Sequence, residues 1–317
     1  MKRSRTARDV RDRLMKNIFG SFLAALFLFS CHHPSEKLEI CFTGDLLLDR
    51  GVREQIDRKG ADALFESISP EFKSADFSIA NLECPVTKVE SPVYKRFVFR
   101  GEPEWLPALK KAGLTHLCMA NNHTYDQGRA GITGTYKNLL KNDLVPLGYG
   151  ADQKQASLPV IIEKNDLRVA IFSSVLVRLE NWEYFADSVG VCQLSAGELS
   201  EEIKKYHNTY PGDKIVVILH WGVEYQPEPD KDQRTSARQF IDAGADAVVG
   251  HHPHVIQSHE YYKGKPIYYS LGNFVFDPTR EEAKKGMLLK LIFSGSEVKD
   301  SYKIFEIKNC APVLTGE

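Results

Sequence analysis

The stretch Ile215–Gly222, IVVILHWG, decides the fold class of this 317-residue chain. Its first five residues are apolar and mostly β-branched, which predicts a short buried strand. Strands that are apolar on both faces are typical of sheets covered by helices. The apolar run stops at His220, so a polar side chain follows directly after a buried strand. We therefore expect an α/β protein whose strand ends carry polar groups.

The same pattern recurs along the chain, where short apolar strands end in Asp, Asn, Glu or His. In open α/β sheets, ligands bind outside the carboxyl ends of the strands, because the sheet positions the loops there. Polar side chains from six strand ends are therefore expected to converge on one site. The expected strands are Leu38–Phe42, Phe77–Ala80, Leu114–Ala120, Ile215–Leu219, Ala247–Val249 and Pro266–Leu271.

Amphipathic stretches lie between these strands and predict helices. No internal repeat, low-complexity tract or Gly/Ser-rich linker divides residues 36–317, so we expect them to form a single domain. The expected helices are Leu106–Ala112, Thr133–Lys141, Glu198–Tyr206 and Thr235–Ala243, and the expected closing strands are Gly286–Phe293 and Ser301–Ile307.

The composition limits the class of protein. Hydrophobic residues make up 43% and charged residues 26% of the chain, as in ordinary globular proteins. Lys and Arg number 41 against 42 Asp and Glu, so no broad basic field supports nucleic-acid binding. The chain has six cysteines and no CxxC pair, which argues against zinc-ribbon and thioredoxin-like proteins.

Residues 1–31 are predicted to be a signal peptide. Residues 18–30, IFGSFLAALFLFS, are apolar and follow basic residues. A run of about 13 residues is too short to span a bilayer, which needs about 20. The ending Leu28-Phe29-Ser30-Cys31 resembles a bacterial lipobox, so we expect lipidation at Cys31. Met15 is an alternative start, and an uncleaved anchor helix is the alternative structure.

The segment His251-His252-Pro253-His254 is the strongest local signal for a metal site. Three imidazoles in four positions follow a glycine at a strand end, and the proline stiffens the loop. With carboxylates and amides from other strand ends they form a mixed nitrogen and oxygen ligand set. Such a set suits one or two divalent transition-metal ions, Mn, Zn or Fe, better than an all-oxygen Ca or Mg site. A surface cluster of histidines is the alternative.

Other polar residues at strand ends have structural alternatives of their own. In Asn121–Asp126, NNHTYD, Asp126 lies three residues past His123 and can orient its ring, whereas a solvated loop is the alternative. Taken singly, Asp45 is explained equally well as a helix cap, and Asn81 and Glu83 as part of a turn. For His220 taken singly, a buried core histidine is the default interpretation.

Taken in order, these motifs resemble the CapA family, named for proteins of poly-γ-glutamate capsule synthesis. The resemblance extends from about residue 38 to residue 277. It implies a variant of the calcineurin-like metallophosphoesterases, whose fold is a four-layer α/β/β/α sandwich. The matching segments are FTGDLLLDRGV, ANLECPVT, MANNHTYDQGRAGITGTYKNL, LHWGVEYQ, GADAVVGHHPHVIQ and YYSLGNFVFD.

The resemblance also implies residue roles. His123 would be the catalytic proton donor and Asp126 its partner. His251 is an alternative to His252 as a ligand. Leu47 stands where the superfamily has a histidine ligand, and Glu83 stands where it has a bridging aspartate. Both departures argue against binding of a second metal ion. The implied metal ligands are Asp45, Asn81, Glu83, Asn122, His220, His252 and His254.

Two main functions follow from the resemblance. The first is a metal-dependent hydrolase of the bacterial cell envelope, lipid-anchored to the membrane, that cleaves a phosphoester or a γ-glutamyl or other amide bond. The second is a non-catalytic carrier or scaffold for a polyanionic polymer, within an envelope synthesis or export complex. A structural lipoprotein with relic histidines is a third interpretation. The candidates to bind the substrate are Arg50, Lys95, Arg96, Arg100 and Asn273. The four basic residues would hold an anionic group, with exposed solubilising charge as their alternative.

Overall fold

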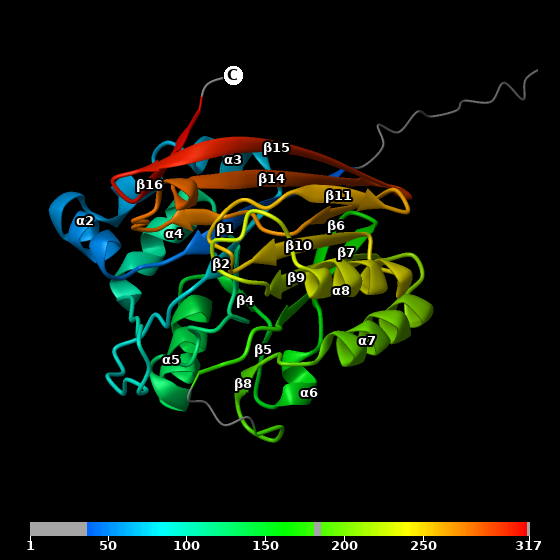
Figure 1. Ribbon diagram of the computed structural model, residues 1–317, viewed down its shortest axis with the longest axis horizontal. Coiled ribbons are helices and arrows are strands. Elements are labelled where there is room, and N and C mark those ends of the chain that lie inside the picture. The colour runs from blue at the N-terminus through cyan, green and yellow to red at the C-terminus, as the bar shows by residue number, and fades with distance from the viewer. Residues whose placement is uncertain (1–36, 181–184, 316–317) are drawn as a thin grey trace, which may run out of the picture. The chain divides into compact units, whose positions relative to one another are not determined.

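Two β-sheets form the framework of the computed structural model, which describes residues 37–180 and 185–315 (Figure 1). The larger sheet has the strand order β16-β15-β14-β1-β2-β3-β4, with β13 paired to β1. The second sheet has the order β11-β12-β10-β9-β7-β6. The expected signal peptide and Cys31 lie outside the described residues. Among the described residues, no helix combines the length and apolar character needed to cross a bilayer.

The strands of the larger sheet are β1 (Leu38–Leu46), β2 (Phe77–Leu82), β3 (His116–Cys118), β4 (Val145–Leu147), β13 (Asn273–Val275), β14 (Lys285–Ser294), β15 (Glu297–Lys308) and β16 (Ala311–Leu314). Those of the second sheet are β6 (Val160–Lys164), β7 (Leu167–Val175), β9 (Lys214–His220), β10 (Ala247–His251), β11 (His259–Tyr262) and β12 (Lys265–Tyr268). A two-stranded sheet pairs β5 (Tyr149–Gly150) with β8 (Gly190–Val191).

Alternating side chains of β9 show how the layers pack. Val216 and Ile218 belong to the main apolar core, which also contains residues of β1, β2 and β14 from the larger sheet. Ile215 and Val217 point the other way, into a second core. Helices α7 (Ala196–Thr209) and α8 (Lys231–Asp242) also contribute residues to this core. The second sheet therefore lies between the larger sheet and these two helices, as the period of two along a strand requires.

Helices α7 and α8 cover the outer face of the second sheet (Figure 1). Both begin with a capping box, formed in α8 by Asp230 and Gln233. On the larger sheet, Phe72 of a short helix packs edge-on against Phe274 of β13, with ring centroids 5.6 Å apart. The remaining helices are α2 (Gly51–Lys59), α3 (Ser69–Ser74), α4 (Leu106–Ala112), α5 (Gly128–Lys141) and α6 (Gln153–Ala156). The predicted α/β/β/α sandwich is confirmed.

The predicted strand Pro266–Leu271 ends early, at the point where the chain leaves the second sheet. Its first part is β12 of the second sheet, which ends at Tyr268. The chain then crosses to the larger sheet, where Asn273 of β13 lies in register with Asp45 of β1. The crossing brings backbone against backbone, because a Cβ on Gly44 would lie 1.9 Å from the carbonyl oxygen of Gly272. A glycine is required at that point.

Candidate metal and catalytic site

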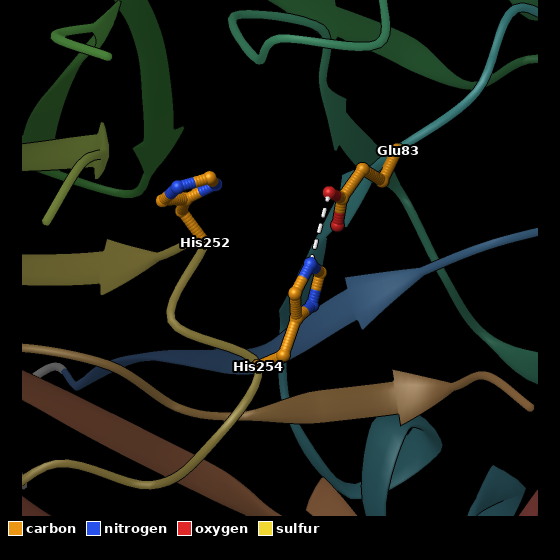
Figure 2. Close-up of side chains that lie close together, drawn as sticks. All are labelled: Glu83, His252 and His254. Atoms are coloured by element: carbon orange, nitrogen blue, oxygen red, sulfur yellow. Dashed lines mark ion pairs between the residues drawn. The ribbon is translucent and has the colours of Figure 1, made fainter. Parts of the chain in front are cut away.

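The carboxyl ends of strands from both sheets meet at one site. Asp45 of β1 pairs with Asn81 of β2 in the larger sheet, and His220 of β9 pairs with His251 of β10 in the second sheet. The parallel strands aim these ends in the same direction, so six predicted strand ends deliver side chains to one place. Figure 2 shows Glu83, which follows β2, facing His252 and His254 from the loop after β10.

One half of the site, here called the histidine half, consists of Asn122, His220 and His252. The Nε2 atom of His220 lies 2.8 Å from Oδ1 of Asn122 and 3.1 Å from Nδ1 of His252. The Oε1 atom of Glu83 lies 3.9 Å from the same Nε2 atom. An imidazole nitrogen, an amide oxygen and a carboxylate oxygen thus lie within 4 Å of His220 Nε2, and together they form a donor set suited to a divalent transition metal. Glu83, His252 and His254 also have ligand atoms within 4.8 Å of one another.

Glu83 provides the test of whether this donor set fits a cation. Its side chain is fully buried, and neither carboxylate oxygen has a hydrogen-bond partner. Burial, and then the charge of Asp45, raise the pKa of Glu83 well above its usual value. Nε2 of His254 lies 3.6 Å from Oε1 of Glu83, but this histidine is shared with Asp45. A buried carboxylate without hydrogen-bond donors is costly, and a metal ion would supply further positive charge. The residues present therefore fit a metal ion.

The other half, here called the aspartate half, consists of Asp45, His254 and Asn273. Nδ1 of His254 lies 3.2 Å from Oδ2 of Asp45 and 2.9 Å from Oδ1 of Asn273. Asn81 donates from Nδ2 to Oδ1 of Asp45 at 2.8 Å, and the backbone N–H of His252 approaches Oδ2 at 3.3 Å. Unlike Glu83, Asp45 has hydrogen-bond partners for both of its carboxylate oxygens.

The two halves differ in charge. Burial and the neighbouring His254 lower the pKa of His252 to about 3, and burial and His252 lower that of His220 well below its usual value. Burial also opposes charge on His254, but Glu83 and Asp45 outweigh it and raise its pKa to about 10. The histidine half therefore offers neutral imidazoles, the form that binds metal, whereas the aspartate half contains an ion pair.

The loop after β10 holds its histidines in a strained backbone. His252 has a φ of 98° and His254 a φ of 57°, in the left-handed region that residues other than glycine seldom occupy. His251, the alternative ligand, instead directs Nε2 to the backbone carbonyl of Thr43 at 3.1 Å. The structure thus brings His252 into the histidine half and turns His251 away from it.

His123 and Asp126 form a pair beside this cluster. Nδ1 of His123 lies 2.9 Å from Oδ2 of Asp126, and the ring packs against Phe99 with centroids 4.3 Å apart. The backbone N–H of Phe99 also donates to Oδ2 of Asp126 at 2.7 Å. Burial lowers the pKa of His123, and the hydrogen bond to Asp126 opposes that shift. Nδ1 of His123 is thereby held on Asp126, and Nε2 is the other nitrogen of its ring.

A cavity of about 350 Å³ opens onto these groups. His123, Glu83 and His254 line it, together with the aromatic residues Phe97, Phe99, Tyr225 and Phe276, and with two of the predicted substrate-binding residues, Arg50 and Asn273. Arg50 lies between the rings of Phe99 and Phe276, at 5.3 and 5.4 Å from their centroids, and forms an ion pair with Asp277.

Two other predicted substrate-binding residues do not line this cavity. Arg100 pairs with Glu90 and Glu102, and Arg96 is exposed, with its guanidinium over Phe97. The aromatic residues of the cavity were not among the predicted site residues. The motifs LHWGVEYQ and YYSLGNFVFD contain two of them, Tyr225 and Phe276, so a signal was present in the sequence.

The architecture and the cluster together define the class of protein, a calcineurin-like metallophosphoesterase fold. Two solved structures share the fold. A putative 5′-nucleotidase from Staphylococcus aureus, in complex with α-ketoglutarate, matches 88% of this chain and 55% of its own, with a TM-score of 0.53 and 14% identity. The NAD nucleotidase of Haemophilus influenzae matches 89% of this chain and 60% of its own, with a TM-score of 0.54 and 10% identity.

Within that class, the chain belongs to the family of the bacterial capsule synthesis protein PGA_cap, whose model matches residues 39–278. It is 35% identical to the capsule biosynthesis protein CapA of Bacillus anthracis over 82% of this chain. It is 34% identical to the PGA biosynthesis protein CapA of Bacillus subtilis over 77% of this chain. The matches span 64% and 65% of the length of those two proteins.

Proposed function

We propose that this protein is a metal-dependent hydrolase of the bacterial cell envelope that acts in capsule or poly-γ-glutamate synthesis or processing. The bond cleaved would be a phosphoester or an amide, such as a γ-glutamyl linkage. The names of the CapA relatives support the biological setting, and the shared fold of the nucleotidases supports a hydrolytic site. An anionic polymer, or a small phosphorylated or γ-glutamyl compound, would be the substrate.

The observation that carries this proposal is the buried carboxylate of Glu83, which has no hydrogen-bond partner and faces the histidine half. Asn122, His220, His252 and Glu83 would hold one divalent ion, of Mn, Zn or Fe. Asp45 and His254, with Asn81 hydrogen-bonded behind them, would complete a second position. When bound, such an ion activates water and polarises a phosphoryl or carbonyl oxygen.

The other residues of the cavity would bind the substrate and move its proton. His123 lines the cavity and Asp126 holds its Nδ1, so the imidazolium that donates the Nε2 proton to a leaving group would be stabilised by the Asp126 carboxylate. Arg50 would attract an anionic group, and the aromatic walls would exclude water. Asn273 fixes His254 through a hydrogen bond rather than facing the substrate alone.

The same proposal places the protein at the membrane. Residues 1–31 would be removed as a signal peptide, and Cys31 would carry the lipid that anchors the domain of residues 36–317. One acyl chain binds a membrane only weakly, so stable attachment would need more than one chain. Mass spectrometry of the membrane fraction should find modified Cys31 as the first residue, and a mature protein that begins elsewhere would contradict the anchor.

A carrier or scaffold function is the alternative, and Leu47 favours it. This residue is fully buried within the main apolar core, at the position where the superfamily provides a histidine ligand. The aspartate half therefore has one imidazole fewer than a complete two-metal site. A protein that binds a polymer without cleaving it needs no second ion.

Elemental analysis and hydrolysis assays on one preparation test both functions. Purified wild type should contain transition metal and cleave phosphoesters or γ-glutamyl peptides. His252→Ala should lose both properties, while His259→Ala, which changes an exposed histidine of β11, should keep both. Wild type with metal but without turnover on either class of substrate would support the carrier, and wild type without metal would contradict the metal site.

A further inference from the structure

Lys95 is buried beside the site although its sequence context suggests an exposed charge. Only 6% of its side chain is exposed, and Asp126, its ion-pair partner, is fully buried. Burial of a lysine is costly unless the ammonium is paired and hydrogen-bonded. The expected role in holding an anionic substrate does not suit an ammonium enclosed in this way.

The contacts of Lys95 all lead to His123. Its Nζ atom forms an ion pair with Oδ1 of Asp126, donates to the backbone carbonyl of Asn122 at 2.9 Å and lies 3.3 Å from Nδ1 of His123. The other carboxylate oxygen, Oδ2, accepts from Nδ1 of His123 and from the backbone of Phe99. Lys95 thus occupies the oxygen that His123 does not use, and it also holds the residue that precedes His123.

The segment around Lys95 encloses the same turn from several sides. The backbone N–H of Val93 donates to the carbonyl of Asp126 at 3.0 Å, and that of Ser91 donates to Oε1 of Gln127 at 2.9 Å. Phe99 covers one face of the His123 ring. Residues 91–99 are therefore fixed to the turn at both ends, with the ammonium of Lys95 at the centre.

We propose that Lys95 is a positioning residue that fixes the Asp126 carboxylate and the Asn122 carbonyl, and thereby holds His123 with Nδ1 on Asp126 and Nε2 toward the cavity. The catalytic consequence rests on the proposed function, whereas the orientation of the ring does not. A carboxylate with two hydrogen bonds to Oδ2 and an ion pair at Oδ1 has one orientation. A reacting group displaced by about 1 Å can lose about 100-fold in rate. Without Lys95, Asp126 would keep its two hydrogen bonds at Oδ2, but Oδ1 would be buried without a partner.

Three variants test this proposal in full-length protein loaded with zinc. Lys95→Met removes the ammonium and keeps the apolar stem, Lys95→Arg restores a cation, and Lys111→Met is the matched control. Lys111 forms an exposed ion pair with Asp62 and is 71% exposed. The orientation of His123 is measured by NMR of ¹⁵N-labelled histidine, with His123→Gln to assign the Nδ1–H signal. Zinc content, thermal unfolding and hydrolysis of bis(p-nitrophenyl) phosphate are measured on the same samples.

Wild type and Lys111→Met should show a slowly exchanging Nδ1–H signal of His123, which Lys95→Met should lose and Lys95→Arg should recover. Zinc content should stay equal in all of them, and where the ester is cleaved, Lys95→Met should lower kcat about 10–100-fold with little change in KM. An unchanged Nδ1–H signal in Lys95→Met overturns the proposal. Loss of zinc or of the folded state in Lys95→Met without recovery in Lys95→Arg also overturns it. Absence of zinc or turnover in wild type contradicts only the proposed function, because the NMR signal still decides the role of Lys95.

Discussion

The histidine half and the aspartate half of the site receive their side chains from similar strand ends, yet they reach charge balance differently. In the aspartate half, Asp45 has partners for both oxygens, among them His254 at 3.2 Å. In the histidine half, two neutral imidazoles and an amide face Glu83, whose oxygens accept no hydrogen bond and whose Oε1 lies 3.6 Å from Nε2 of the same His254. One charged imidazole is thus shared by two buried carboxylates, and Glu83 is the one that a further cation would serve.

This difference shows that a suitable set of ligand types does not by itself give two equal metal positions. The partners that a carboxylate already has decide how much a metal ion can add. We therefore expect the first ion to bind at the histidine half and Glu83, much more tightly than a second ion at Asp45. The buried Leu47 strengthens this expectation, because it leaves the aspartate half with one imidazole fewer.

The largest expected effect concerns His123, which belongs to neither half. His123→Gln should lower turnover about 10²–10⁴-fold, the usual contribution of a general acid. Bound metal should not change, because no ligand is removed. Elemental analysis and steady-state kinetics on one preparation give both values. Loss of metal and stability together would show that His123 only holds the loop.

His252→Ala should weaken binding of the first metal ion about 100-fold or more, beyond the cost of losing a residue that only supports a ligand. The reason is that a neutral imidazole nitrogen of the histidine half is removed. Competition with a chelating dye measures the affinity, and circular dichroism checks the fold. Affinity equal to that of wild type would remove His252 from the ligand set.

Asp45→Asn should weaken the first ion only about tenfold, the lower range for residues that act through a ligand. Asp45 touches His254 and the backbone of His252, so its main effect on the histidine half is indirect. The same dye competition applies. An affinity loss as large as that of His252→Ala would end the distinction between the two halves.

The smallest effect at neutral pH is expected for a buried histidine far from any ligand, His116. Burial lowers its pKa to about 4, so the folded state binds its proton less readily than the unfolded chain does. Stability is then complete above about pH 6.5 and falls as the pH drops toward 4, by about 2–3 kcal/mol. His116→Gln should reduce that part of the pH dependence in urea unfolding, without changing metal affinity. A pH dependence identical to wild type would exclude the effect.

Much of this architecture could be predicted from apolar runs and the residues that end them. The helix Leu106–Ala112 has the predicted bounds, and His220, His252 and His254 lie close together as the strand ends indicated. The hairpin of β6 and β7 was not predicted, although Asn165 at its turn, with a φ of 52°, is a typical turn residue. Strand β1 extends beyond its predicted end at Phe42, because the polar residue Asp45 still pairs in the sheet.

Other features depend on contacts between distant parts of the chain, which a local pattern does not contain. The ion pair of Arg50 with Asp277 joins residues 227 positions apart and needs the fold to exist first. Lys95 stands among exposed residues in the sequence, and only the turn at Asp126 explains its burial. Whether a charged residue meets substrate or a buried partner is decided by tertiary structure.

The crossing of the chain from β12 to β13 has a consequence for how the protein opens. Asn273 is held by β1 on the larger sheet and bonds His254, which comes from the loop of the second sheet. The two sheets cannot separate by local fluctuation without breaking this connection, so their backbone amides should exchange with deuterium as one cooperative unit. A ligand at the strand ends would then slow exchange in β1 and β10 alike, including amides that it never touches.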